Sequence, residues 1–206
     1  LIQDVLQPMR ALYLRMPAVA TLVLAVGAGY LIGGIRSALV VCALTLFIAF
    51  SPWWDRALVT LYMATFGVVI SCLIGFTVGT LCFQNKKSAA FMLGICDIFQ
   101  TFPSFVYLIP VMMLFGITDT SVLIAVVVYA TIPATRYTIE GLRSVPVGLH
   151  EAATMSGVNK FQRLTKIEFP LAFPHMMLGL NQTIVFALFM VIIGAFIGTE
   201  DLGQYI

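Results

Sequence analysis

The residues that most suggest a function lie in one mixed polar stretch, residues 140–170, between two apolar segments. This stretch contains one spaced set of acidic, small and apolar residues: Glu151, Ala152, Ala153, Gly157, Ile167 and Pro170. The small side chains would let a partner surface come close. Gly157 is predicted to end a first short helix as its C-cap, and Pro170 to end a second over residues 159–169.

The same stretch carries three basic side chains, Lys160, Arg163 and Lys166, at three-residue spacing. This spacing gives the second predicted helix a basic face. A basic face is also typical of a helix that lies on anionic lipid. The residues alone therefore leave two interpretations open, a docking surface for a partner protein and an interfacial helix pair.

A second polar group interrupts the apolar stretch of residues 89–116. Its members are Asp97, Gln100 and Thr101, followed by Pro103 and Pro110. Polar residues at membrane depth usually face the bundle interior and mark transport pathways. Proline frees backbone carbonyls, which is tolerated where the backbone lines a cavity. We predict a pathway wall here; the alternative is a kinked packing helix that Asp97 caps near the cytoplasmic interface.

Two further groups of residues could contact a solute. Phe105 and Tyr107 could offer aromatic faces to a quaternary ammonium cation, although packing explains them equally well. Asn181 and Gln182, beside Thr183, form the polar patch of the last apolar stretch. They could line the pathway or form hydrogen bonds between helices.

Several catalytic interpretations fail on the same sequence. The segment from His150 to Thr154 begins like the zinc motif H-E-x-x-H but lacks the second histidine. A P-loop and a nucleophile elbow are both absent from the sequence. The four cysteines lie in apolar stretches without C-x-x-C spacing. We therefore expect no enzyme activity, no metal site and no cofactor in this chain.

The composition indicates which elements must position these residues. Hydrophobic residues make up 61% of the 206 and charged residues only 10%, whereas soluble domains have about 25% charged residues. The sequence predicts an all-α integral membrane protein, a polytopic helical bundle. Six candidate spans follow one another: residues 16–34, 37–51, 57–83, 89–116, 122–138 and 174–198.

The chain divides into two predicted parts. Residues 1–56 would form an N-terminal tail with two accessory transmembrane segments, and residues 57–206 a core that contains the cytoplasmic stretch 140–170. The first residue is Leu1 rather than Met, so we expect a preceding N-terminal segment, and we expect one more span after the tail. Three glycine pairs at four-residue spacing predict close helix packing: Gly29 with Gly33, Gly75 with Gly79, and Gly194 with Gly198.

The basic residues predict the orientation. Eight of them fall on one side of the predicted spans, and three, Arg10, Arg15 and Arg56, fall on the other. Because lysine and arginine are enriched in cytoplasmic loops, the first side is predicted to be cytoplasmic. The eight are Arg36, Lys86, Lys87, Arg136, Arg143, Lys160, Arg163 and Lys166.

The spacing from Glu151-Ala152-Ala153 to Gly157, Ile167 and Pro170 resembles the cytoplasmic signature loop of permeases in binding-protein-dependent ABC importers. Other segments resemble the glycine betaine/proline (quaternary amine) branch of that family: residues 100–110, 113–116, 179–183 and 201–204. The similarity runs from about Ala57 to the end of the chain. The family pattern has an aliphatic residue before the glutamate, whereas this sequence has His150. We expect this difference to affect the details of the docking contact.

The resemblance implies a type I ABC importer permease in the bacterial inner membrane, crossing it several times. The loop would form a coupling helix that docks on an ATP-binding subunit, present in two copies and holding ATP and Mg²⁺. A second permease copy and an extracytoplasmic substrate-binding protein would complete the complex, without nucleic acid.

The implied substrate is glycine betaine, proline betaine or a choline-like compatible solute. Another small solute, such as a methylated amine or an amino acid, is the first alternative. An ATP-independent secondary transporter is the second, and it leaves the 140–170 pattern without explanation. An intramembrane enzyme is the third, and it lacks a convergent nucleophile, base or metal set.

Overall fold

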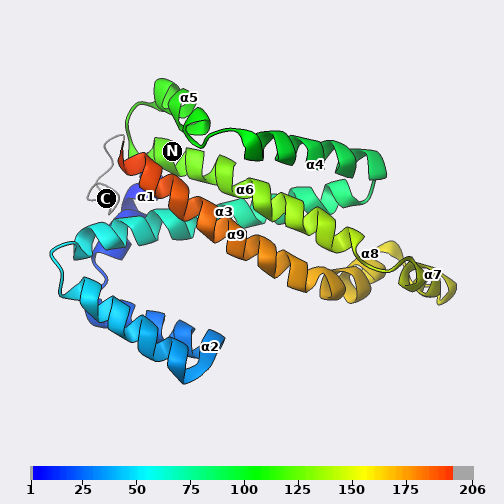
Figure 1. The fold of residues 1–206 in the computed structure, drawn as a ribbon, viewed down its shortest axis with the longest axis horizontal. Coiled ribbons are helices and arrows are strands. Elements are labelled where there is room, and N and C mark those ends of the chain that lie inside the picture. The colour runs from blue at the N-terminus through cyan, green and yellow to red at the C-terminus, as the bar shows by residue number, and fades with distance from the viewer. Residues whose placement is uncertain (1, 197–206) are drawn as a thin grey trace.

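The computed structural model describes residues 2–196, and their side chains from residue 7, as an elongated helical bundle without a strand in that range (Figure 1). The predicted all-α fold is confirmed. The elements in chain order are α1 (Ile2–Leu14), α2 (Ala18–Ala49), α3 (Trp54–Phe83), α4 (Lys86–Thr101), α5 (Phe105–Phe115), α6 (Asp119–Arg143), α7 (Val147–Met155), α8 (Lys160–Arg163), the π-helical turn η1 (Leu164–Glu168) and α9 (Phe169–Ala195).

Four of the described helices have the length and apolar composition of a membrane span, namely α2, α3, α6 and the continuous helix Lys160–Ala195, although α2 reaches this length only across a kink at Gly34. The bent pair of α4 and α5 makes a fifth crossing if it counts as one span. The multi-pass character predicted from the sequence is therefore confirmed. The sixth predicted span, 174–198, starts inside α9, and its last residue, Gly198, lies outside the described residues.

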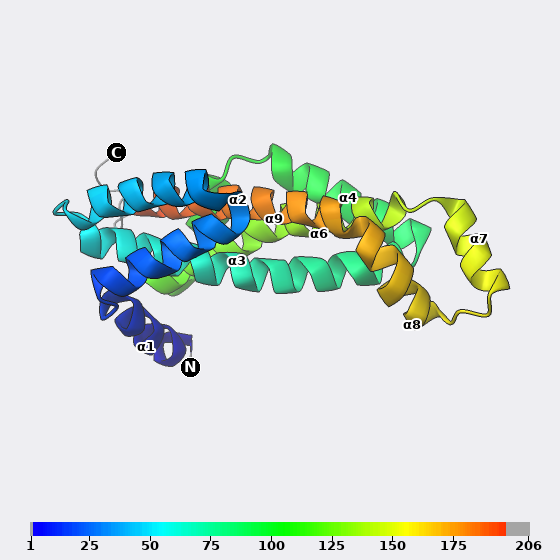
Figure 2. The ribbon, with the colours of Figure 1, turned by 90° about the horizontal axis from the view of Figure 1, so that it is seen from below.

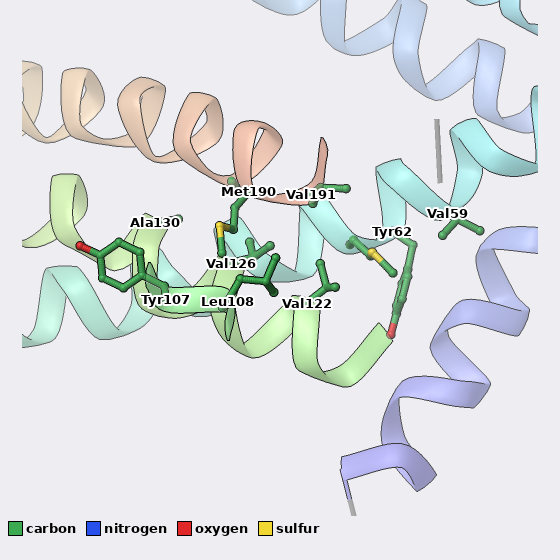
Figure 3. Packing of buried hydrophobic residues seen from close by; sticks show 12 residues of the cluster. Val59, Tyr62, Tyr107, Leu108, Val122, Val126, Ala130, Met190 and Val191 are labelled. Carbon is green, nitrogen blue, oxygen red and sulfur yellow. The ribbon is translucent and has the colours of Figure 1, made fainter. Parts of the chain in front are cut away.

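The core forms where α6 packs between α3 and α9. A Cβ added at Gly75 of α3 would lie 2.4 Å from Cβ of Ala134, and one added at Gly79 would lie 2.7 Å from Cβ of Thr138. Only glycine permits this approach of α3 to α6, as the Gly75–Gly79 spacing predicts. Figure 3 shows the apolar cluster at one end of this core, where Leu108 of α5, Val126 of α6 and Met190 of α9 meet.

The helix pair α4 and α5 bends by 89° between Thr101 and Phe105. Pro103 lies in the bend, as expected for a residue that cannot donate a backbone hydrogen bond. Pro110, in contrast, lies inside α5 without breaking it. The predicted irregular middle of residues 89–116 is confirmed, and Pro103 marks it.

Helix α2 reverses direction at Gly34, whose φ of 68° and ψ of −161° are not helical. The second arm runs back beside the first from this turn, as Figure 2 shows, and Gly29 on one arm lies against Ala38 and Val41 on the other. The first two predicted spans, 16–34 and 37–51, correspond to these arms. Each arm extends roughly 23 Å, less than the ~30 Å of a hydrocarbon core.

The basic loops lie at one end of the bundle, where α3 ends, α4 begins and α6 ends (Figure 1, right). Helices α7 and α8 project beyond this end, as Figure 2 also shows. The expected stop at Pro170 is wrong, since α8, η1 and α9 form one continuous helix from Lys160 to Ala195. The wider π-helical turn before Pro170 shifts the backbone hydrogen bonds, so the proline sits in the first turn of α9, where its missing N–H costs little.

Candidate functional site

Helix α7 ends at the glycine that the sequence predicts. Gly157 has a φ of 71°, its N–H donates to the Thr154 carbonyl at 3.1 Å, and the Val158 N–H donates to the Ala153 carbonyl at 3.1 Å. These two bonds form a Schellman motif, in which a left-handed residue closes the helix. No atom lies within 4 Å of a Cβ added at Gly157. Backbone conformation, rather than crowding, therefore requires glycine here.

Most of the predicted coupling residues line one groove between α7 and the start of α9. The groove has a volume of about 550 Å³, and Ala152 and Ala153 form one wall while Ile167 and Pro170 form the other. Glu151 and Gly157 do not line it, and both are exposed. The structure thus brings four of the six residues together around an open, mainly apolar surface.

A buried carboxylate that the sequence reasoning missed connects α7 to the continuous helix. Glu168 of η1 is 2% exposed, and its Oε1 lies 2.9 Å from Nε of Arg163 and 3.2 Å from Nδ1 of His150. Arg163 and Glu168 are five residues apart, a spacing that only a π-helical turn brings onto one face. The α-helical spacings of three and four would not pair them, so no simple sequence signal was available.

The predicted basic face of Lys160, Arg163 and Lys166 is divided between two surfaces. Lys160 and Arg163 border a cavity of about 850 Å³ between the loop and the ends of α3 and α6, together with Lys86 and Arg143. Lys166 instead borders the groove beside α7. The extra residue in the π-helical turn rotates Lys166 away from the other two.

A charged network joins α4 to α6 at the polar residues for which the sequence predicts a pathway wall. Arg136 of α6 donates from Nη1 to Asp97 at 2.5 Å and to Gln100 at 3.0 Å, and from Nε to Glu140 at 3.0 Å. The side chains are partly open to the surroundings, at 60% exposure for Asp97, 30% for Arg136 and 39% for Glu140. Sequence reasoning placed Asp97 and Gln100 here but missed Arg136 and Glu140 as their partners.

The remaining predicted pathway residues do not gather in one place. Thr101, Pro103 and Phe105 are exposed around the bend between α4 and α5. Asn181 is exposed and Gln182 half-buried on α9. Their contact with a solute stays a prediction.

Tyr107 is buried in a chain of aromatic rings that runs across four helices. Its ring lies 5.7 Å from Phe99 of α4 and 5.3 Å from Tyr129 of α6, and Tyr129 stacks at 4.8 Å on Phe186 of α9. The Tyr107 hydroxyl also donates to the Phe99 carbonyl across the bend. These contacts give Tyr107 a packing role, and its contact with a solute stays a prediction.

Comparison with known proteins identifies the family. Residues 67–206 match the family described as "Binding-protein-dependent transport system inner membrane component". The chain belongs to this family. These permeases are inner-membrane components, in agreement with the several membrane-crossing helices of the structure.

The relatives of this permease chain are transport system permease proteins. It is 88% identical over its whole length to the trimethylamine N-oxide transport system permease protein TmoV of Pelagibacter ubique, and covers 29% of that protein. A TmoV from Ruegeria pomeroyi is 47% identical over 97% of this chain and 30% of that protein. The glycine betaine/proline betaine permease ProW of Escherichia coli is 32% identical over 98% of this chain and 57% of that protein. The chain thus spans less than a third of the TmoV proteins that it matches.

A solved structure supports the fold. The inward-facing MetNI methionine ABC transporter matches with a TM-score of 0.61 and 24% identity, over 71% of this chain and 74% of that chain. The helical arrangement is therefore that of an ABC importer permease, as the signature loop implied.

Proposed function

We propose that this chain is the membrane-spanning permease subunit of an ATP-driven importer for small methylated amines. Trimethylamine N-oxide and glycine betaine are the first candidate solutes, because the relatives are permeases for these two compounds. Both solutes combine a cationic trimethylated nitrogen with an anionic oxygen. The high identity to TmoV shifts the expected substrate from betaines alone toward trimethylamine N-oxide.

One observation supports the coupling part of this proposal most strongly. Ala152, Ala153, Ile167 and Pro170 converge on the groove beside α7, at the end of the bundle that carries the basic loops. A short helix with small side chains beside an apolar groove is suited to rigid docking. The ATP-binding subunit would seat on α7 and transmit its closure to the spans through α9, which continues directly from the loop.

The complete transporter would contain several partners. Two ATP-binding subunits would hold ATP and Mg²⁺, a second permease copy would form the other half of the pathway, and an extracytoplasmic binding protein would deliver the solute. The permease itself would lie in a bacterial inner membrane. An ATP-independent secondary transporter is the competing function, and it leaves the groove beside α7 without a role.

The test is uptake by the full-length permease reconstituted in proteoliposomes with its ATP-binding subunit and binding protein. Labelled trimethylamine N-oxide and glycine betaine are supplied separately, with ATP or a non-hydrolysable analogue inside. Uptake that requires hydrolysable ATP is the expected result. Uptake that instead follows an imposed proton or sodium gradient without ATP would overturn the ATP-driven mechanism.

A further inference from the structure

We propose that Asp97, Arg136 and Glu140 form a contact site for the transported methylated amine on the cytoplasmic half of the pathway. The inference rests on the proposed function and adds to it the residues that meet the solute inside the membrane. It concerns the network between α4 and α6, which is separate from the groove beside α7.

The network lies within the membrane rather than in a loop. Arg136 is seven residues before the end of α6 at Arg143, which places it about 10 Å from the cytoplasmic end. Asp97 is eleven residues after the start of α4 at Lys86, or about 16 Å along that helix. Taking these helix ends as the membrane surface, both positions fall inside a hydrocarbon layer of about 30 Å.

The exposure of these charges excludes lipid as their neighbour. Asp97 is 60% exposed and Glu140 is 39% exposed, so the chain itself covers neither carboxylate. Charged side chains at membrane depth face a water-filled cavity or another protein surface, because hydrocarbon does not solvate them. The face of α4 and α6 that carries the network therefore borders water or a partner subunit, as the wall of a pathway between two permease copies does.

The chemistry of the network suits a solute with charges of both signs. Two carboxylates and one guanidinium leave one formal negative charge in excess, which attracts a trimethylated nitrogen. Arg136 uses Nε and Nη1 for its bonds, while Nη2 donates to no group among the described residues. Nη2 is thus placed to donate to the anionic oxygen of a betaine or an N-oxide.

A purely structural clamp between α4 and α6 is the competing explanation. The ion pair between Arg10 and Asp119 provides a matched comparison, because it also joins two helices at 2.9 Å with both side chains partly exposed, 38% and 30%. It lies at the opposite end of α6 from the network. A variant there measures what the loss of a clamp alone does.

The experiment compares Asp97→Asn and Glu140→Gln with Asp119→Asn in the complete transporter. Uptake of glycine betaine is expected to fall about tenfold in the first two variants, since each removes a carboxylate that meets the cation. Asp119→Asn is expected to keep uptake within about twofold. Melting temperatures of the three complexes identify any variant that fails to fold.

A second readout detects the contact directly. Saturation-transfer NMR on the complex without its binding protein reports whether the methyl protons of glycine betaine touch the permease. We expect a signal with the wild type and with Asp119→Asn, a weaker one with Asp97→Asn, and no competition by 3,3-dimethylbutyrate, which has the same shape without the cationic nitrogen. Equal signals in all variants, no signal with a wild type that imports, or equal losses of uptake in Asp97→Asn and Asp119→Asn would each overturn the inference. Failure of the wild type to import would instead count against the proposed function.

Discussion

The residue Glu168 shows how one buried side chain can control the coupling loop. Its carboxylate accepts from Arg163, lies 3.2 Å from Nδ1 of His150 and is almost completely covered. Glu168→Gln is expected to destabilise the π-helical turn by about 3 kcal/mol, because the Arg163 guanidinium loses its charged partner. It should also loosen the contact with His150, which joins this turn to α7. The transporter should then hydrolyse more ATP for each solute imported. Simultaneous measurement of uptake and phosphate release gives this ratio.

His150 provides the control for that prediction. His150→Leu removes the contact that joins α7 to the continuous helix but leaves the pair of Arg163 and Glu168 intact. It should raise the ATP-to-solute ratio less than Glu168→Gln, which disturbs both contacts. If Glu168→Gln lowers the yield of complex and leaves the ratio unchanged, the residue is structural only.

A docking loop can need glycine for its backbone conformation or because a side chain would crowd the partner, and Gly157 allows these two reasons to be tested separately. At a φ of 71° an alanine is strained by about 1–2 kcal/mol, although its Cβ would meet open space. Gly148 lies inside α7, and a Cβ there also meets nothing within 4 Å. Gly157→Ala should therefore impair substrate-stimulated ATP hydrolysis, while Gly148→Ala should leave it close to wild type. Equal effects would point to crowding against the partner as the cause.

These residues also show how far the sequence predicts the site. The end of α7 at Gly157 could be predicted from local backbone chemistry, and the small residues of α7 could be recognised from their spacing. The partners of Glu168 and Arg136 could not be predicted in this way. Arg163 and Glu168 meet through a π-helical turn, and Arg136 meets Asp97 from a helix 39 residues away in the chain. Such contacts depend on the packing of helices, which apolar periodicity does not determine.

At the scale of elements, Tyr107 bridges the bend between α4 and α5. Its hydroxyl bonds to the Phe99 carbonyl on the other side of the bend, and its ring packs between Phe99 and Tyr129. Tyr107→Phe keeps the packing and should lower the free energy of unfolding by about 1 kcal/mol. Tyr107→Leu also loses the ring contacts and should cost more. Thermal unfolding of the purified permease complex ranks the two variants.

Transport kinetics then decide whether Tyr107 also meets the solute. If its role is only to hold the bend, Tyr107→Phe should transport with an unchanged KM. A several-fold rise in KM with unchanged stability would place the hydroxyl in the pathway. The sequence predicted the break itself from Pro103, but the polar and aromatic contacts that set its 89° angle come from α4 and α6 together.

At the scale of the whole molecule, the first 56 residues divide into a packed helix and a peripheral one. Helix α1 lies against α3 and α6, where Tyr13 contacts the rings of Tyr62 and Phe66 and Arg10 pairs with Asp119. Helix α2 makes few contacts with the rest of the bundle, and most of its apolar side chains are exposed. The sequence did not predict which of the two helices packs on the core. Both precede the core, and α2 is the more apolar of the two although it is the more exposed.

This division predicts different responses to the same kind of truncation. Tyr13→Ala removes an aromatic ring from the core cluster and should destabilise the complex by about 2–3 kcal/mol. Leu31→Ala on α2 removes a side chain that is 85% exposed in this chain. If α2 lies only in lipid, Leu31→Ala should leave the melting temperature in detergent unchanged. A drop as large as that of Tyr13→Ala would show instead that α2 packs on another subunit of the transporter, because the chain itself offers Leu31 almost no contact to lose.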